Sequence, residues 1–425
     1  MKTDITQDRY GSVEVLTAQD IARPEIADDA TTAFPLRRPR WSRGPRTPAW
    51  SWRGVFRGLG RLFVGLLVGI LIFVGFSAVM RVQTVTLPAP SGASVVGRTE
   101  LALNDTGRLD PFATDGRTRE LSVWIWYPAV EGASGADAPY LPSAWAPLVN
   151  NLGPLSQDLS AVRTNSIANA QLDGRPPVVV LMPGLGQPVA SYSALAEDLA
   201  SNGYAVVGIN PTESTDVVFP DGRLVPATAL GGIAEMTVDD WYVSAERVTT
   251  VWAADAEFVA RSLAASPPQV GALDFDRVAY LGHSVGGAAS FEACRLDANC
   301  AAAVNLDGTL WTEVRHTGLQ APSLLLERAA SGTCDAFCER AATDFANVEA
   351  AGGGERFVVE GSQHQSFGDL GLMWGPATAQ LLGPIDADRM TVITRDVVRS
   401  FLDVHVLDAP AATFTAATAR YSELR

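Results

Sequence analysis

Apolar and polar positions follow two alternating periods along most of the chain. Short apolar runs rich in β-branched residues predict strands, and apolar residues spaced three or four positions apart predict helices. The predicted strands cover about 121–127, 177–182, 204–209, 278–282, 301–306, 323–327 and 356–360, and the predicted helices cover about 191–201, 241–263, 286–294, 335–350 and 386–406. Strands that alternate with helices predict an α/β fold with a mostly parallel sheet flanked by helices.

The longest apolar run, residues 62–80, fits none of these elements. It has no charged residue, and Ser77 is its only clearly polar member. A helix of this length can nearly cross a hydrocarbon core. Eleven Lys and Arg residues precede it within residues 1–61, so the positive-inside bias predicts a signal anchor with a cytoplasmic N-terminus and an exported C-terminal part. A signal peptide cleaved near residues 75–77 is the alternative.

Composition divides the rest of the chain. Residues 1–61 lack a sustained apolar period and are expected to be a disordered cytoplasmic tail. Residues 81–118 contain several prolines and glycines and are expected to be a tether, followed by one folded domain over 119–425. After Arg81 the chain holds twenty Lys and Arg against forty Asp and Glu, and this acidic balance argues against nucleic-acid binding.

All four cysteines lie in the part expected to be exported, where disulfides persist. They are Cys294, Cys300, Cys334 and Cys338. Their spacings do not match common zinc patterns, so no metal site is expected. Two local disulfides are favoured, although four cysteines allow three pairings.

The pentapeptide Gly282–Gly286, with Ser284 at its centre, has the form Gly-x-Ser-x-Gly. It lies between a predicted strand and a helix that begins with small residues, which is the context of a nucleophile elbow. Small neighbours allow the strand and the helix to approach closely around a strained serine. Ser284 is therefore the candidate nucleophile.

A serine nucleophile needs a histidine base and a carboxylate that orients the base. The chain has only four histidines; His364 comes soon after the last predicted strand, whereas His405 lies in the predicted last helix. Asp307 ends the strand after Ser284 and is the first choice for the acid, which gives the chain order Ser, Asp, His. The other acids considered are Asp335, Asp344 and Glu327, with Asp344 as the fallback.

An oxyanion also needs backbone N–H donors. We expect one from Val285, the residue after the nucleophile, and one from Leu185 in the turn Pro183–Gly186. Pro183 has no N–H to offer. An ordinary glycine turn is the alternative for this segment.

These residues carry a resemblance to the plasma-type (isoform II) platelet-activating factor acetylhydrolase family of α/β-hydrolases. It extends from about residue 121 to 407 and rests on the segments 126–128, 184–186, 192–194, 198–201, 282–287, 306–308, 364–367 and 385–386. The resemblance implies the same triad, Ser284, Asp307 and His364, and oxyanion donors at Leu185 and Val285. It departs at Pro183, where the family has histidine, in the insert over about 211–232, and in the N-terminal anchor.

The resemblance implies a serine ester hydrolase without cofactor or metal that acts on short-chain or oxidised acyl esters of lipids through an acyl-enzyme. Its expected partners are the ester substrate and the membrane. Three alternatives stay open: a cutinase or polyester-type esterase, an envelope acyltransferase with the same triad, and a non-catalytic binding protein on this fold.

Overall fold

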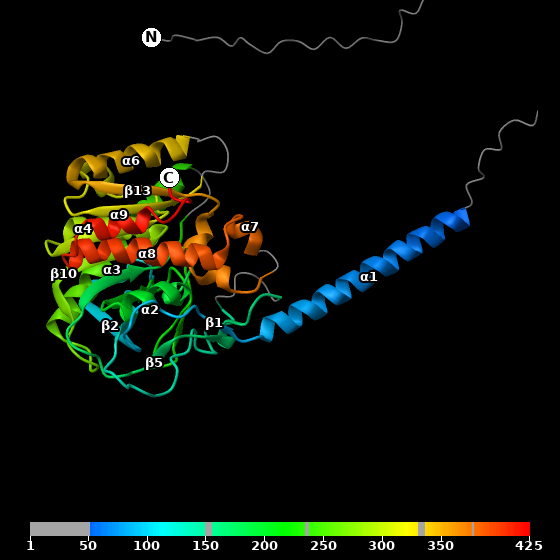
Figure 1. The fold of residues 1–425 in the computed structure, drawn as a ribbon, viewed down its shortest axis with the longest axis horizontal. Helices are drawn as coiled ribbons and strands as arrows, with labels where there is room; N and C mark the ends of the chain where they lie inside the picture. Colours follow the sequence, from blue (N-terminus) through cyan, green and yellow to red (C-terminus); the bar gives the residue numbers. More distant parts are fainter. Residues whose placement is uncertain (1–51, 149–154, 234–237, 330–335, 376–377) are drawn as a thin grey trace, which may run out of the picture. The chain divides into compact units, whose positions relative to one another are not determined.

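The protein is described by a computed structural model over residues 52–148, 155–233, 238–329, 336–375 and 378–425. The chain divides into two compact units, Met1–Val64 and Gly65–Arg425, and the folded domain lies in the second (Figure 1). The expected cytoplasmic tail lies almost wholly outside the described residues. The expected catalytic domain, 119–425, lies within the second unit.

Helix α1 (Trp52–Val82) contains the whole predicted span of residues 62–80. Of the helices in the described part of the chain, it is the one whose length and apolar composition suit a membrane crossing, and its qualifying segment is Val55–Val82. Most of its apolar side chains are exposed.

Nine of the strands in the described residues form one sheet in the order β13-β12-β11-β10-β6-β7-β3-β2-β5. The strands are β1 (Val85–Thr86), β2 (Val96–Leu109), β3 (Thr118–Pro128), β4 (Val162–Arg163), β5 (Ser166–Ala168), β6 (Pro177–Met182), β7 (Ala205–Asn210), β8 (Val217–Val218), β9 (Leu224–Val225), β10 (Asp274–His283), β11 (Cys300–Leu306), β12 (Ser323–Arg328) and β13 (Gly354–Val359). Strands β7, β6, β10, β11, β12 and β13 run parallel, and β3 is antiparallel to both β7 and β2. The predicted α/β fold with a mostly parallel sheet is confirmed.

The segment 81–118 is not simply a tether. Strand β2 pairs with β3 over most of its length and joins the central sheet. Its second half alternates between exposed and half-buried positions, and it contains Gly97, Gly107 and several charged residues. A strand near the margin of a sheet needs few buried apolar side chains. The composition of this segment therefore resembles that of a loop, and the strand was not predicted.

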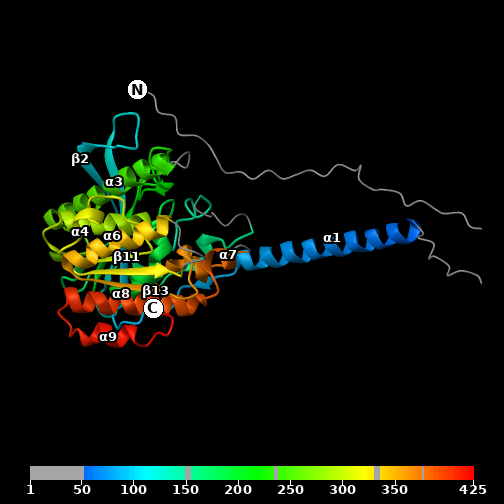
Figure 2. The ribbon, with the colours of Figure 1, turned by 90° about the horizontal axis from the view of Figure 1, so that it is seen from above.

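Helices cover both faces of the sheet (Figure 2). The helices that follow α1 are α2 (Ser193–Ser201), α3 (Val238–Ala265), α4 (Val285–Leu296), α5 (Val314–Thr317), α6 (Ala336–Gly352), α7 (Thr378–Leu382), α8 (Ala387–Val406) and α9 (Ala412–Thr418), with short 3-10 helices η1 (Leu159–Ala161), η2 (Val189–Tyr192), η3 (His364–Phe367) and η4 (Asp369–Leu372). Successive side chains of a strand point to opposite faces. In β6, Val179 and Leu181 therefore pack with α2 and α8, whereas Val178 and Val180 pack with α3 and α4.

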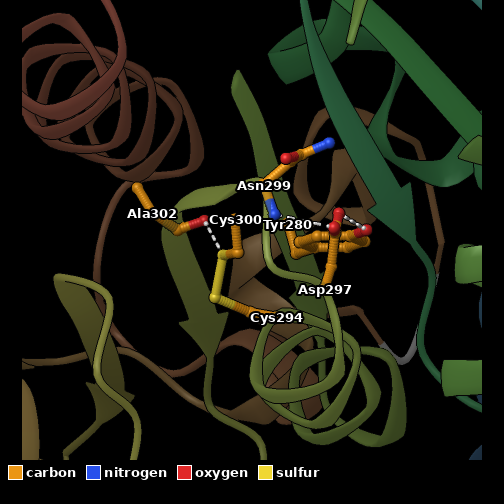
Figure 3. The surroundings of a disulfide bond; sticks show 6 residues. All are labelled: Tyr280, Cys294, Asp297, Asn299, Cys300 and Ala302. Atoms are coloured by element: carbon orange, nitrogen blue, oxygen red, sulfur yellow. Dashed lines mark hydrogen bonds between the residues drawn. A yellow bond between two sulfur atoms is a disulfide. The ribbon is translucent and has the colours of Figure 1, made fainter. Parts of the chain in front are cut away.

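A disulfide joins Cys294 in α4 to Cys300 at the start of β11 (Figure 3). Beside it, the Tyr280 hydroxyl donates to Asp297 Oδ2 at 2.7 Å. This pairing is one of the local ones expected. Cys334 and the side chain of Cys338 lie outside the described residues. The disulfide links α4 to β11 at the ends opposite to those that carry Ser284 and Asp307.

Candidate active site

Ser284 occupies a sharp turn between β10 and α4. Its backbone angles, φ 57° and ψ −124°, lie in a region that costs a non-glycine residue about 1–3 kcal/mol. The turn is fixed by a hydrogen bond from Ser284 N–H to the Leu306 carbonyl of the neighbouring strand at 2.9 Å. The local structure therefore presents the serine hydroxyl at the edge where the parallel strands end.

Two glycines make this turn possible. A Cβ atom on Gly282 would lie 2.2 Å from the Gly286 carbonyl oxygen, and one on Gly286 would lie 2.3 Å from the Pro183 carbonyl oxygen. Both contacts are with backbone atoms, which cannot rotate away. The glycines are needed because strand, turn and helix approach each other too closely for any side chain.

The structure brings Ser284, His364 and Asp307 together from three separate segments. Nε2 of His364 lies 2.9 Å from Ser284 Oγ, and Nδ1 lies 2.5 Å from Asp307 Oδ2. Asp307 directly follows β11, and His364 begins η3 after the last strand. Both distances are within reach for proton transfer and for orientation of the imidazole ring.

Arg328, at the end of β12, also holds the Asp307 carboxylate. Its backbone N–H donates to Oδ1 at 3.0 Å, and its guanidinium donates to Oδ2 at 2.6 Å. Burial alone would raise the pKa of Asp307, but the hydrogen bond from His364 and the electrostatic interactions with His364 and Arg328 outweigh it and leave this pKa below its ordinary value. Asp307 is thus held as a carboxylate. Sequence analysis did not select Arg328, although it follows a strand at the same edge as Asp307.

His283 adjoins Ser284 in sequence but points into the core. Its Nε2 lies 2.8 Å from the His364 carbonyl oxygen, and its Nδ1 lies 2.6 Å from the Tyr192 hydroxyl. The same hydroxyl accepts a hydrogen bond from the Gly184 N–H at 3.1 Å. Burial, followed by the nearby charge of His364, lowers the pKa of His283 to about 3. A neutral His283 therefore links the backbone of His364 to the turn at Gly184 through Tyr192.

The two expected oxyanion donors come from different segments. Val285 is the first residue of α4, and the first N–H groups of a helix have no intrahelical acceptor. In the opposite turn the Gly184 N–H is already bonded to Tyr192, whereas Leu185 borders a cavity. Gly186 has a φ of 75°, which turns the chain sharply beside Leu185. The geometry is compatible with the choice of Leu185 and Val285.

A cavity of about 250 Å³ opens next to this turn. Its walls combine apolar side chains with polar ones from the Leu185 turn and from the segment that begins at His364. They include Leu159, Leu185, Gln187, Gln365, Leu370 and Met373. Gln187 donates to Gln365 at 2.7 Å across the wall. Asp369 also lines the cavity and accepts from the Ala194 N–H at the start of α2 at 3.2 Å, and burial raises its pKa well above the ordinary value.

The other candidate acids that the structure describes, Glu327 and Asp344, have different surroundings. Glu327 pairs with Arg356 at 2.6 Å, and Asp344 lies on α6. Asp335 lies outside the described residues. Of the acids considered, Asp307 is the one that contacts His364. Among the described residues, no group of three or more His, Cys, Asp and Glu side chains is placed to hold a metal ion.

Comparisons with known proteins find one family and two proteins to which the chain is similar. Residues 268–408 match the family described as platelet-activating factor acetylhydrolase, isoform II. Over 250 residues the chain is 27% identical to a protein of Arthroderma benhamiae described as a probable 1-alkyl-2-acetylglycerophosphocholine esterase, covering 55% of this chain and 61% of that relative, which is less than two thirds of its length. A solved structure of ferulic acid esterase from Streptomyces cinnamoneus is similar, with a TM-score of 0.70, 30% identity, and coverage of 81% of this chain and 99% of that one.

A mostly parallel sheet with a serine elbow, and the order serine, aspartate, histidine along the chain, define the class of the α/β-hydrolases. Within that class, residues 268–408 are similar to the platelet-activating factor acetylhydrolase, isoform II, family, and this matched segment contains Ser284, Asp307 and His364. Both relatives described above are named esterases. The chain is therefore a member of a group of carboxylic ester hydrolases.

Proposed function

We propose that the protein hydrolyses carboxylic esters through an acyl-enzyme on Ser284. The single observation that carries this proposal is the continuous hydrogen-bonded chain from Ser284 Oγ through His364 to Asp307, with distances of 2.9 and 2.5 Å. In this arrangement His364 accepts the serine proton, and the carboxylate orients the ring and stabilises the imidazolium that forms.

In the first half of the reaction, Ser284 Oγ attacks the ester carbonyl carbon while its proton passes to His364 Nε2. The π electrons of the carbonyl group move onto its oxygen, and the N–H groups of Leu185 and Val285 stabilise the resulting oxyanion. The tetrahedral intermediate then collapses. The bond to the alcohol oxygen breaks, His364 returns the proton to that oxygen, and the alcohol leaves.

In the second half, water takes the place of the alcohol. His364 accepts a proton from the water as its oxygen attacks the acyl carbon, and a second oxyanion forms in the same position. Its collapse breaks the bond to Ser284 Oγ, which regains its proton from His364. A carboxylic acid is released, and the enzyme returns to its starting state.

The proposed substrates are short-chain or oxidised acyl esters of lipids. One relative is named for an acetyl ester of an ether phospholipid and the other for ferulic acid, so both small acyl groups and aromatic acids belong in the test. The proposed location is the membrane, with the N-terminus in the cytoplasm and the hydrolase domain on the outer side. The apolar helix α1 and the basic residues before it support that orientation.

The test is turnover of p-nitrophenyl esters of increasing chain length by the full chain in detergent, beside acetylated ether phospholipid, oxidised phospholipid and methyl ferulate. We expect Ser284→Ala to reduce kcat by about 10⁴-fold or more, as loss of a nucleophile does in other serine hydrolases. Ser290→Ala, a buried serine in the same helix, is the matched control. Equal turnover by Ser284→Ala and the unaltered chain would exclude this mechanism.

A further inference from the structure

The outer end of α1 is built into the hydrolase domain. Phe76 packs edge-on against Trp374 with ring centroids 5.3 Å apart, and Ser77 is fully buried. The Arg81 carbonyl, in the last turn, accepts hydrogen bonds from Asp158 N–H at 2.9 Å and from the Gln157 amide at 3.1 Å. The small side chain of Ser77 allows the helix to approach the domain closely.

The attachment continues beyond the helix. The Gln157 amide also donates to the Gln83 carbonyl at 2.8 Å, and β1 pairs with β4. Trp374 is fixed on its other side, because its indole N–H donates to the Leu155 carbonyl at 3.2 Å and its carbonyl accepts from the Gln157 N–H at 2.7 Å. The helix end is therefore held by two segments, around residues 155–159 and 373–374.

These same two segments form one wall of the cavity that opens next to the Leu185 turn. Gln157, Leu159 and Met373 line it at that end, and Leu185 and Gly186 of the expected oxyanion turn line it at the other. Helix α7 contributes Leu381 to the lining. The cavity thus extends from the expected oxyanion turn and His283, the sequence neighbour of Ser284, to the segments that hold the domain end of α1.

We propose that this cavity takes its ester directly from the membrane, and that the substrate is an ester whose hydrocarbon tail stays in the bilayer. The proposal rests on the proposed function, both the esterase activity and the anchoring. A spanning helix that ends at the cavity wall places that wall at the bilayer surface. Leu381, which lines the cavity, is 40% exposed. An exposed apolar side chain of this kind lowers the free-energy cost of moving a lipid tail out of the membrane.

The experiment compares two esters with the same leaving group and the full chain reconstituted in phosphatidylcholine vesicles. One is p-nitrophenyl acetate in the aqueous phase, and the other is a long-chain p-nitrophenyl ester dissolved in the bilayer. Two variants loosen the attachment: Phe76→Ala removes the ring contact with Trp374, and Ser77→Leu places a bulky side chain at the close approach. Phe73→Ala, one turn earlier and 45% exposed, is the matched control.

We expect Phe76→Ala and Ser77→Leu to lower turnover of the bilayer ester relative to the soluble ester by about fivefold or more, the lower range of coupling between two sites. Phe73→Ala should leave this ratio unchanged. An unchanged ratio in both loosened variants, with soluble turnover intact, would overturn the proposal. Failure of the unaltered chain to cleave p-nitrophenyl acetate would instead reject the proposed esterase activity, and release from vesicles by alkaline carbonate would reject the anchoring.

Discussion

Two clusters of arginine and aspartate lie at the edge of the sheet where β7 and β11 end, and they differ in one respect. In the first, Arg119 in β3 is fully buried; its guanidinium donates to Asp255 at 2.7 Å, to Asp110 at 3.2 Å and to the Thr212 carbonyl at 2.9 Å. In the second, Arg328 and His364 share the carboxylate of Asp307.

The first cluster is closed, because its carboxylates and guanidinium face one another away from solvent. The second is open, because His364 is 33% exposed in its side chain and its other nitrogen reaches Ser284 Oγ. A closed cluster has no atom left to act on a substrate. The open cluster ends at the Ser284 hydroxyl, so it differs from the closed cluster in its exposure and in the reactive side chain at its end.

The largest effect should come from Asp307→Asn in the open cluster. A carboxamide at this position no longer enforces the imidazole tautomer that accepts the serine proton, and kcat should fall by about 10⁴-fold. The same exchange in the closed cluster, Asp255→Asn, should leave kcat of the folded protein within a few-fold. Steady-state turnover of p-nitrophenyl acetate measures both. A fall of less than tenfold in Asp307→Asn would show that Asp307 does not orient the base.

For the free energy of unfolding, in contrast to activity, a substitution in the closed cluster should have the large effect. Arg119→Met leaves the buried Asp110 carboxylate without its cation and leaves Asp255 with Arg108 alone, and loss of one partner of a buried ion pair costs about 3–5 kcal/mol. The exposed Arg175, 57% accessible in its side chain, is the matched control, because surface pairs contribute about 0–1 kcal/mol. Urea unfolding followed by circular dichroism measures the difference. Equal stabilities of Arg119→Met and Arg175→Met would contradict the closed-cluster interpretation.

Replacing Arg328 should have an effect of intermediate size, and this effect should be on activity alone. A hydrogen bond to a charged group contributes about 1.5–3 kcal/mol, and about 1.4 kcal/mol of transition-state stabilisation corresponds to tenfold in rate. Arg328→Gln should therefore lower kcat about tenfold with KM nearly constant, and Arg328→Lys should restore part of it because the charge is kept. Arg356→Gln, which alters the neighbouring pair with Glu327, is the control. A change in KM alone would assign Arg328 to substrate binding.

The contrast between the clusters also explains what the sequence could predict. Ser284, Asp307 and His364 each come soon after an apolar run, so strand ends are visible in the hydrophobic pattern, and parallel strands bring their ends to one edge. Arg328 also lies at a strand end, so its position could be predicted in the same way, but a single arginine there matches no catalytic pattern. The closed cluster joins residues 110, 119 and 255, and no local period connects positions so far apart.

Strand β2 shows the same limit in the fold. Its pairing with β3 depends on backbone hydrogen bonds, which leave no apolar signature where the side chains face solvent. The predicted tether over 81–118 followed from prolines and glycines around this strand. The hydrophobic pattern therefore located the buried strands that carry the site and missed the marginal strand that does not.

The smallest effect should be a pH dependence that belongs to His283. Its pKa is about 3 in the folded protein and about 6.5 in an unfolded chain, so the unfolded state binds one more proton between those values. The free energy of unfolding must then fall as pH falls below about 6.5, by at most ~1.4 kcal/mol per pH unit from this residue, and the loss continues until pH approaches 3.

His283→Gln removes this proton uptake and should flatten the dependence of unfolding free energy on pH between 6 and 4, even if the variant is less stable at neutral pH. The measured quantity is the slope, taken from urea unfolding at several pH values. His316→Gln is the control, because His316 lies on the short helix α5 outside the site. An identical slope in His283→Gln and the unaltered chain would mean that the histidine between Tyr192 and the His364 carbonyl is not held neutral, and the link between the two loops would then need a different protonation state.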